Sequence, residues 1–129
     1  MTIHPKHIQV SQYYSDMRLL VSRCSSDKYD AIVCLKRSGF IVGAYLSFQT
    51  GIPLFVTSEI GVIPSKFERV LLLDDKVYSG KSIRGWQAKL ELMDKKVTTA
   101  AMYLQHEYHT DIYVRDLGCQ HTMFYELAG

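Results

Sequence analysis

The chain has 129 residues, of which 47% are hydrophobic and 22% are charged, and its formal net charge is +2. This length fits a single domain, and the composition excludes a disordered tail, a collagen-like repeat and a coiled coil. The balanced charge gives no electrostatic reason to predict a nucleic-acid binder, and no apolar run approaches the ~20 residues that cross a bilayer. Residues 1–10 lack the apolar core of a secretory signal, so we expect a cytoplasmic protein.

The first half of the chain contains two predicted helices and two predicted strands. Apolar residues at helical spacing predict a helix over 9–23, and a continuous apolar run predicts a buried strand over 30–35. A second helix is predicted over 40–49, ended by Gly51, and a short strand follows over 54–56.

The second half contains, in chain order, a loop, a strand, a turn, a helix and a strand, which we place at 58–66, 70–73, 76–80, 81–95 and 98–104. The strand at 70–73 has the strongest apolar pattern and is expected to end at Asp74 and Asp75. Residues 111–129 contain short aromatic segments without a clear period, so no regular element is predicted there.

The alternation of strands and helices predicts one α/β domain over residues 1–129, a parallel twisted sheet flanked by helices on both faces. In such sheets, ligands bind beyond the carboxyl ends of the strands. Two loops follow predicted strands at this edge, residues 36–39 and residues 74–82, and they are the chemically richest stretches of the chain.

The second of these loops combines two adjacent carboxylates with a small turn that contains glycine. Asp74 and Asp75 repel one another unless a cation or hydroxyl groups meet them. Residues 79–82, Ser-Gly-Lys-Ser, open the next predicted helix, whose N–H groups and dipole favour an anion. A ligand that is part polyol and part phosphate, such as a ribose 5-phosphate, suits this combination.

The same residues also have simpler interpretations. The two acids can end the strand and cap the next turn, with Ser79 as a helix N-cap. The run Gly80-Lys81-Ser82 matches the end of a P-loop, but that motif needs a glycine five positions before Gly80, where this chain has Asp75. A carboxylate there would face the phosphates, so we reject a P-loop nucleotide hydrolase.

The stretch from Val70 to Ser82 resembles the phosphoribosyl-pyrophosphate (PRPP) motif of the type I phosphoribosyltransferases, which is a hydrophobic strand, two acids, three residues and Thr/Ser-Gly-x-Thr/Ser. The resemblance covers roughly residues 9–127 and is strongest to small microbial purine enzymes of the xanthine–guanine–hypoxanthine type. It implies the fold of that family, with a small C-terminal hood over the base site formed by residues 106–129. It also implies a transferase of nucleotide salvage that uses Mg²⁺ and forms a homodimer. Its partners would be small-molecule substrates, with neither nucleic acid nor membrane among them.

The resemblance assigns a role to each part of the site. Asp74 and Asp75 are implied to be catalytic, to meet the ribose hydroxyls and to bind the metal. The 5′-phosphate would be bound by the loop that follows, namely Lys76, Val77, Tyr78, Ser79, Gly80, Lys81 and Ser82. The pyrophosphate would be bound by the loop after the first strand, namely Lys36, Arg37, Ser38 and Gly39. A cis peptide bond is expected between Leu35 and Lys36, and the base would be contacted by Gln105, Met123 and Phe124.

The chain departs from the family pattern at three places. Tyr78 stands where 6-oxopurine enzymes carry an aspartate near purine N7, and tyrosine is a poor general base at neutral pH. Gln105 stands where those enzymes carry a lysine for the 6-oxo group, and an amide can either donate or accept. The mobile catalytic loop, expected between Thr57 and Arg69, is short.

Two hypotheses about function follow. The first is an enzyme that moves the 5-phosphoribosyl group from PRPP to a nucleobase, with a purine favoured, and releases pyrophosphate and a nucleoside monophosphate. The second is a protein of the same fold that senses PRPP or a nucleotide without catalysis, and the three departures motivate it.

Overall fold

The computed structural model describes residues 7–24, 27–105, 108–118 and 122–123. Within these ranges, the helices are α1 (Val10–Arg23), α2 (Gly39–Thr50), the 3₁₀-helix η1 (Thr57–Val62) and α3 (Lys81–Leu92). The strands are β1 (His7–Ile8), β2 (Ala31–Cys34), β3 (Leu54–Val56), β4 (Arg69–Val77), β5 (Lys96–Leu104), β6 (Ile112–Asp116) and β7 (Thr122–Met123). None of the helices in the described ranges is both long and apolar enough to cross a membrane.

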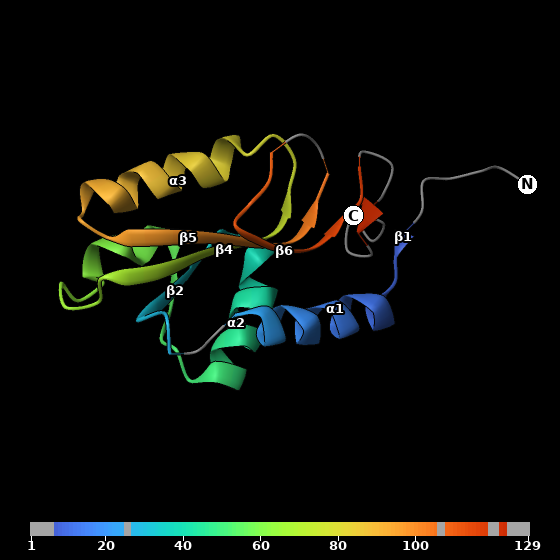
Figure 1. Cartoon of the computed structure of the whole chain (residues 1–129), viewed down its shortest axis with the longest axis horizontal. Helices are drawn as coiled ribbons and strands as arrows, with labels where there is room; N and C mark the ends of the chain where they lie inside the picture. Colours follow the sequence, from blue (N-terminus) through green and yellow to red (C-terminus); the bar gives the residue numbers. More distant parts are fainter. Residues whose placement is uncertain (1–6, 25–26, 106–107, 119–121, 124–129) are drawn as a thin grey trace, which may run out of the picture.

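Five strands form one parallel sheet in the order β3-β2-β4-β5-β6 (Figure 1). The short strands β1 and β7 form a separate parallel pair. The predicted α/β fold with a parallel sheet is confirmed. Because the strands of the main sheet run in the same direction, their carboxyl ends lie at one edge, where the loops after β2 and β4 are neighbours.

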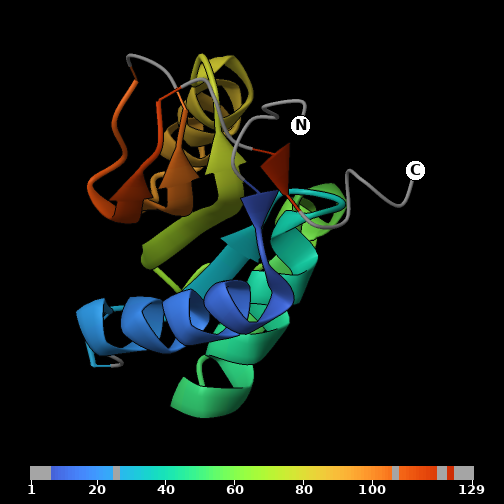
Figure 2. The same cartoon turned by 90° about the vertical axis from the view of Figure 1, so that its right-hand side faces the viewer.

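Helices α1 and α2 cover one face of the main sheet, and α3 covers the other (Figures 1 and 2). Strand β4 packs against both layers. Leu71 and Leu73 belong to the core cluster that includes residues of α1 and α2, whereas Val70 and Leu72 belong to the cluster that includes residues of α3. Since successive side chains of a strand point to opposite faces, a strand buried on both faces is a continuous apolar run, as the sequence predicts for 70–73.

A buried carboxylate fixes α1 against the sheet. Asp16 of α1 is fully buried, and its Oδ2 accepts a hydrogen bond of 2.6 Å from the hydroxyl of Tyr103 in β5. The Nε of Arg115 in β6 lies 3.0 Å from the same oxygen. A buried carboxylate is tolerated only where hydrogen bonds and an opposite charge offset its desolvation, so this network specifies how α1 docks.

Strand β4 does not end at the two acids, which corrects the prediction. It runs through Asp74 and Asp75 to Val77, because Asp74, Lys76 and Val77 each pair with a residue of β5. The backbone ladder therefore overrides the polar character of these side chains, and both acids lie inside a strand.

Two elements of the second half, α3 and β6, also differ from the prediction. Helix α3 ends at Leu92 rather than at residue 95, and Asp94 just beyond it has a left-handed φ of 62°. Strand β6 lies in a stretch where the sequence predicts no element, and it forms the edge of the main sheet beside β5. Its five residues are too few to show a clear period, so the pairing with β5 is what defines it.

Gly43→Ala is expected to destabilise the protein by about 1–3 kcal/mol, the usual cost of overpacking a core. A Cβ atom at Gly43 would lie 2.9 Å from the Cβ of Cys34 and 3.1 Å from the Cδ1 of Leu54, so α2 would have to move away from β2 and β3.

Gly85→Ala is the matched control, because Gly85 is also inside a helix and nothing lies within 4 Å of its added Cβ. It is expected to stabilise the protein by about 0.5–1 kcal/mol. Urea denaturation measures both effects, and equal values would contradict the close packing of α2.

Candidate functional site

The main sheet brings the two chemically rich loops together. In the β2–β4 ladder, Cys34 lies opposite Leu73, and the Leu35 N–H donates to the Leu73 carbonyl over 2.9 Å. Helix α2 then begins at Gly39, where a Cβ atom would lie 3.2 Å from the Oδ1 of Asp74. Glycine at this position therefore allows the start of α2 to lie against the first of the two carboxylates.

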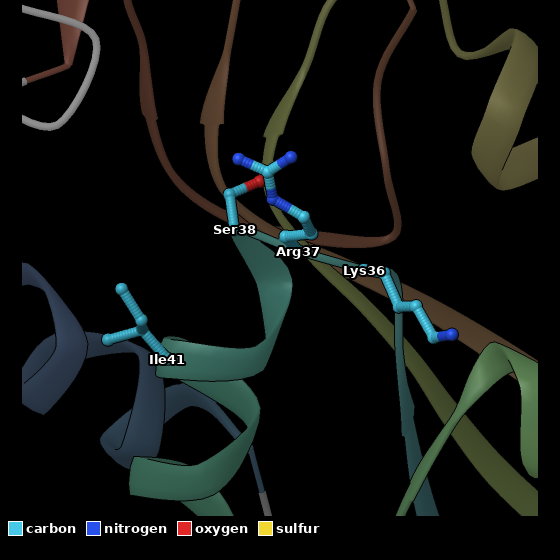
Figure 3. A pocket seen from close by; sticks show the side chains of 4 residues that line it. All are labelled: Lys36, Arg37, Ser38 and Ile41. Carbon is cyan, nitrogen blue, oxygen red and sulfur yellow. The ribbon is translucent and has the colours of Figure 1, made fainter. Parts of the chain in front are cut away.

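A cavity of about 530 Å³ opens beside the first loop, and it is lined by Lys36, Arg37, Ser38 and Ile41. Figure 3 shows Arg37 and Ser38 projecting to the same side from the start of α2, with Lys36 pointing away from them. Lys36 and Arg37 are exposed. Two cations and a hydroxyl beside a helix N-terminus suit an anion with several oxygen atoms. Gly39, the fourth residue predicted for this role, is buried against Asp74 instead of lining the cavity.

The cis peptide bond of this loop lies between Lys36 and Arg37. From the sequence it is expected between Leu35 and Lys36, and that expectation is wrong by one residue. The Leu35 N–H still takes part in the pairing of β2 with β4, so the regular strand backbone persists to this residue and the irregular backbone begins after it.

A second cavity, of about 170 Å³, lies against the loop between β4 and α3. It is lined by Asp74, by Ile83 and by all seven residues predicted to bind a phosphate, namely Lys76, Val77, Tyr78, Ser79, Gly80, Lys81 and Ser82. Gly80 has a left-handed φ of 80° and directly precedes α3, and the Lys81 N–H donates to the Ser79 Oγ over 3.3 Å. The N–H groups of a first helical turn lack acceptors inside the helix, so an anion in this cavity would find donors there.

The two carboxylates have different surroundings. Asp74 lines the second cavity, and its Oδ1 accepts a hydrogen bond of 2.9 Å from the Asp75 N–H. Asp75 is only 1% exposed and does not line that cavity. Burial, and then the neighbouring charge of Asp75, raise the pKa of Asp74 to about 8. A cation or hydroxyl donors at Asp74 would stabilise its charged form.

Tyr13 of α1 lies close enough to the acids to respond to them. Burial raises the pKa of Tyr13, and the negative charges of Asp75 and Asp74 raise it further. Tyr13 occupies an apolar position of an amphipathic helix, where tyrosines usually belong to the core, so the sequence does not mark it as a functional residue.

The predicted base contacts have three different positions. Gln105 is buried directly after β5, and its N–H donates to the Val77 carbonyl over 2.9 Å, so it lies beside the phosphate loop. Met123 pairs with Ile8 in the β1–β7 ladder, and its side chain is outside what the structure describes. Phe124 lies outside the described residues, and the C-terminal hood stays a prediction.

The described residues contain no group of three or more His, Cys, Asp or Glu side chains that could hold a metal ion. Asp74, which lines the second cavity, nevertheless fits Mg²⁺ chemically, whereas Asp75 beside it is buried. This ion usually takes one or two protein carboxylates and completes its octahedral shell with water and substrate phosphates.

Solved structures resemble this chain over nearly its whole length. The xanthine-guanine-hypoxanthine phosphoribosyltransferase of Helicobacter pylori matches with a TM-score of 0.84 and 21% identity, covering 97% of this chain and 95% of the other. A purine phosphoribosyltransferase of Pyrococcus horikoshii matches with a TM-score of 0.77 and 20% identity, covering 94% and 93%. A hypothetical protein of Neisseria gonorrhoeae, solved with bound ppGpp, matches with a TM-score of 0.73 and 15% identity, covering 97% and 92%. The chain has the type I phosphoribosyltransferase fold.

At the level of sequence alone, no protein-family model and no curated protein matches this chain. With identities of 15–21%, the three structures establish the phosphoribosyltransferase fold, and the fold leaves the chemistry to be argued from the site.

One part of the phosphoribosyltransferase fold is compact in this chain. Between β3 and β4, where the mobile catalytic loop is expected, the chain forms η1 and a short turn. Ile63 is buried, and Ile60 and Phe67 pack against the core cluster on the α3 side of the sheet. This connection is therefore short and held against the domain.

The pH dependence of stability is expected to reveal the raised pKa of Asp74. An unfolded aspartate titrates near ~3.9, so between about pH 4 and pH 8 the folded chain keeps a proton that the unfolded chain has released. The free energy of unfolding should therefore fall as pH rises through this window, by at most about 1.4 kcal/mol per pH unit. Asp74→Asn should lose this part of the slope. Urea denaturation of both proteins across the window checks this, and identical slopes would contradict it.

Proposed function

We propose that this protein transfers the 5-phosphoribosyl group of PRPP to a nucleobase, releasing pyrophosphate and a nucleoside monophosphate. The observation that carries the proposal is the placement of two cavities at one sheet edge, one lined by Lys36 and Arg37 and the other by the start of α3 and Asp74. PRPP has a diphosphate at C1 and a phosphate at C5, so it needs two separate anion sites with a polar group between them. The phosphoribosyltransferase fold supports the same assignment.

In this proposal, the bond between C1 of the ribose and the pyrophosphate oxygen breaks, and the oxygen keeps the electron pair. A ring nitrogen of the base forms the new bond to C1 and releases its proton to solvent. Lys36 and Arg37 stabilise the charge on the leaving pyrophosphate. Asp74 contacts the ribose and favours the positive charge that develops at C1, and the buried Asp75 beside it adds negative charge. The phosphate bound at residues 79–82 orients the reacting carbon.

Asp74 and Asp75 are also the residues that would hold Mg²⁺ together with the substrate. The ion would offset negative charge on the diphosphate and so make pyrophosphate a better leaving group. The raised pKa of Asp74 supports a cation at this position, because a cation would bring that carboxyl back to its charged form.

We propose a purine as the acceptor base. The support is that purine and xanthine-guanine-hypoxanthine phosphoribosyltransferases match this chain over more than nine-tenths of its length. Gln105 would meet the 6-position of the base through its amide, and Met123 and Phe124 would provide further contacts. The cytoplasmic location expected from the sequence is part of this proposal.

A second candidate function is the binding of PRPP or a nucleotide without catalysis. The compact connection between β3 and β4 favours it, because a short segment held by Ile60 and Phe67 is poorly suited to close over a reacting ligand. The Neisseria gonorrhoeae protein with bound ppGpp supports a ligand of the same kind, a nucleotide with phosphate groups at two positions.

Pyrophosphate release from PRPP and Mg²⁺, measured with guanine, hypoxanthine, xanthine, adenine, uracil and orotate, distinguishes the two functions. Release is expected with a purine. Asp74→Asn and Asp75→Asn should each lower kcat/KM by on the order of 100-fold, because both remove charge from the centre that stabilises C1. Asp94→Asn is the control. Asp94 is exposed beyond α3, and asparagine tolerates its left-handed φ.

Two outcomes would count against the transferase. Binding of PRPP or a nucleotide in calorimetry, without release of pyrophosphate with any base, would favour the sensing function. Unchanged turnover in Asp74→Asn and Asp75→Asn would contradict the assignment of the site itself.

We also propose that two copies of the chain pair through the outer face of α1 and α2. Helix α2 contains no charged residue, and a helix that is apolar on all sides is normally buried on all sides. Its outer face is nevertheless exposed, together with part of α1, at Val10, Tyr14, Phe40, Ile41 and Phe48. Three of these side chains are aromatic, and with Tyr14 and Phe40 about half exposed and Phe48 more so, they can contribute a substantial share of the ~800 Å² that each partner of a standard interface buries.

Phe48→Glu is expected to make the protein monomeric, because it places a charge at the most exposed apolar position of this face. Leu92→Glu at the end of α3 is the matched control, since both side chains are 86% exposed. Sedimentation velocity of the two variants and of the unaltered protein measures the effect. Loss of the dimer in both variants, or in neither, would argue against this surface.

A further inference from the structure

The ring of Tyr108 lies directly against Gly80 in the phosphate loop. A Cβ atom on Gly80 would come within 2.3–2.7 Å of three ring atoms of Tyr108, which is closer than real Cβ atoms approach. Gly80 is buried, although its neighbours Ser79 and Lys81 are exposed. The tyrosine therefore covers the loop at the residue that turns the chain into α3 with a left-handed φ of 80°.

Arg84 of α3 completes this contact. Its Nε donates to the Gly80 carbonyl over 3.2 Å, and its guanidinium carbon lies 5.4 Å from the centre of the Tyr108 ring, which is within cation–π range. Arg84 does not line the cavity beside the loop. Its side chain therefore supports the contact between Tyr108 and Gly80 rather than a ligand in that cavity.

Tyr108 is itself anchored to the domain. Its ring packs against the core cluster on the α3 side of the sheet. It lies three residues beyond Gln105, whose N–H donates to the Val77 carbonyl at the end of β4. The chain that leaves β5 thus touches the phosphate loop at both ends, at Val77 and at Gly80.

We propose that Tyr108 is a positioning residue that holds the phosphate loop in its binding conformation. Without the ring, Gly80 can leave its left-handed conformation more readily, and the residues at the start of α3 that line the cavity then change position with it. The candidate base contact Gln105 and the phosphate loop then belong to one coupled unit, so occupation of either stabilises the other. The inference rests on the proposed function, because it takes residues 79–82 as the phosphate contacts.

Calorimetry with two small probes tests this role. Tyr108→Ala is expected to weaken the binding of ribose 5-phosphate on the order of tenfold and to leave the affinity for inorganic pyrophosphate within about twofold. The difference arises because pyrophosphate is bound by Lys36 and Arg37 on the other loop. Tyr108→Phe keeps the ring and should bind like the unaltered protein. Trp86→Ala is the control, because Trp86 packs against the same core cluster, whereas the three atoms nearest to a Cβ at Gly80 all belong to Tyr108.

A pair of glycine variants separates the ring contact from backbone strain. Gly80→Ala and Gly51→Ala both place alanine at a left-handed φ, 80° and 78°, but nothing lies within 4 Å of a Cβ at Gly51. Gly80→Ala should abolish ribose 5-phosphate binding, whereas Gly51→Ala should lower only stability. In the Tyr108→Ala background, Gly80→Ala should weaken binding much less, because the clashing ring is gone.

Amide hydrogen exchange at residues 79–82 provides a readout that needs no ligand. Faster exchange in Tyr108→Ala but not in Trp86→Ala is the expected result. Unchanged exchange in Tyr108→Ala, or an equal loss of affinity for ribose 5-phosphate and pyrophosphate, would overturn the inference. Failure of the unaltered protein to bind either ribose 5-phosphate or PRPP would instead overturn the proposed function.

Discussion

Strands β2 and β4 run in parallel as neighbours, and their pairing persists at the Leu35 N–H after β2 has ended. The rest of the site depends on this constraint. It makes the chain leave both strands at the same edge, and it allows α2 to start against Asp74, where any side chain at Gly39 would intrude. The two loops proposed to bind anions are separated by 35 or more residues along the chain, but the ladder brings them to one edge of the sheet.

The way charge is distributed over the two loops says more about what binds there than the net charge of the chain does. A net charge of +2 is nearly neutral, yet Lys36 and Arg37 are gathered at one loop and two acids at the other. The acids lie side by side in a strand that is buried, which raises the pKa of Asp74. Such an arrangement is unfavourable for the protein alone and becomes favourable when a cation or hydroxyl groups arrive, so the electrostatics support a ligand that brings both kinds of group.

The sequence correctly predicts the strands and the loop that build this site. It predicts less well how long the strands are and which side chains become buried. The apolar runs that become β2, β3 and β4 are strong local signals, and the spacing from Asp74 to Ser82 identifies the loop that lines the second cavity. The length of β4 is not predicted, because pairing with β5 extends it through polar residues. The burial of Asp75 depends on that extension.

Other features depend on contacts between distant parts of the chain, and no local pattern reports them. Tyr108 contacts Gly80, which lies 28 positions earlier in the chain. Asp16 is hydrogen-bonded to Arg115, which lies 99 positions later. Strand β6 is defined by its place beside β5. These are the features for which a three-dimensional structure was needed.

The separate pairing of β1 with β7 has a consequence for how specificity can change. The proposed phosphate and pyrophosphate contacts follow strands of the five-stranded sheet, whereas Met123, a proposed base contact, lies in the two-stranded ribbon formed by β1 and β7. The backbone pairing of that ribbon is separate from the ladders of the main sheet, although Ile8 of β1 packs in the core cluster on the α1 and α2 side of the sheet. If the proposed roles hold, selection can change the acceptor through Met123 and its neighbours in the ribbon, while the residues proposed for the sugar and its phosphates stay the same.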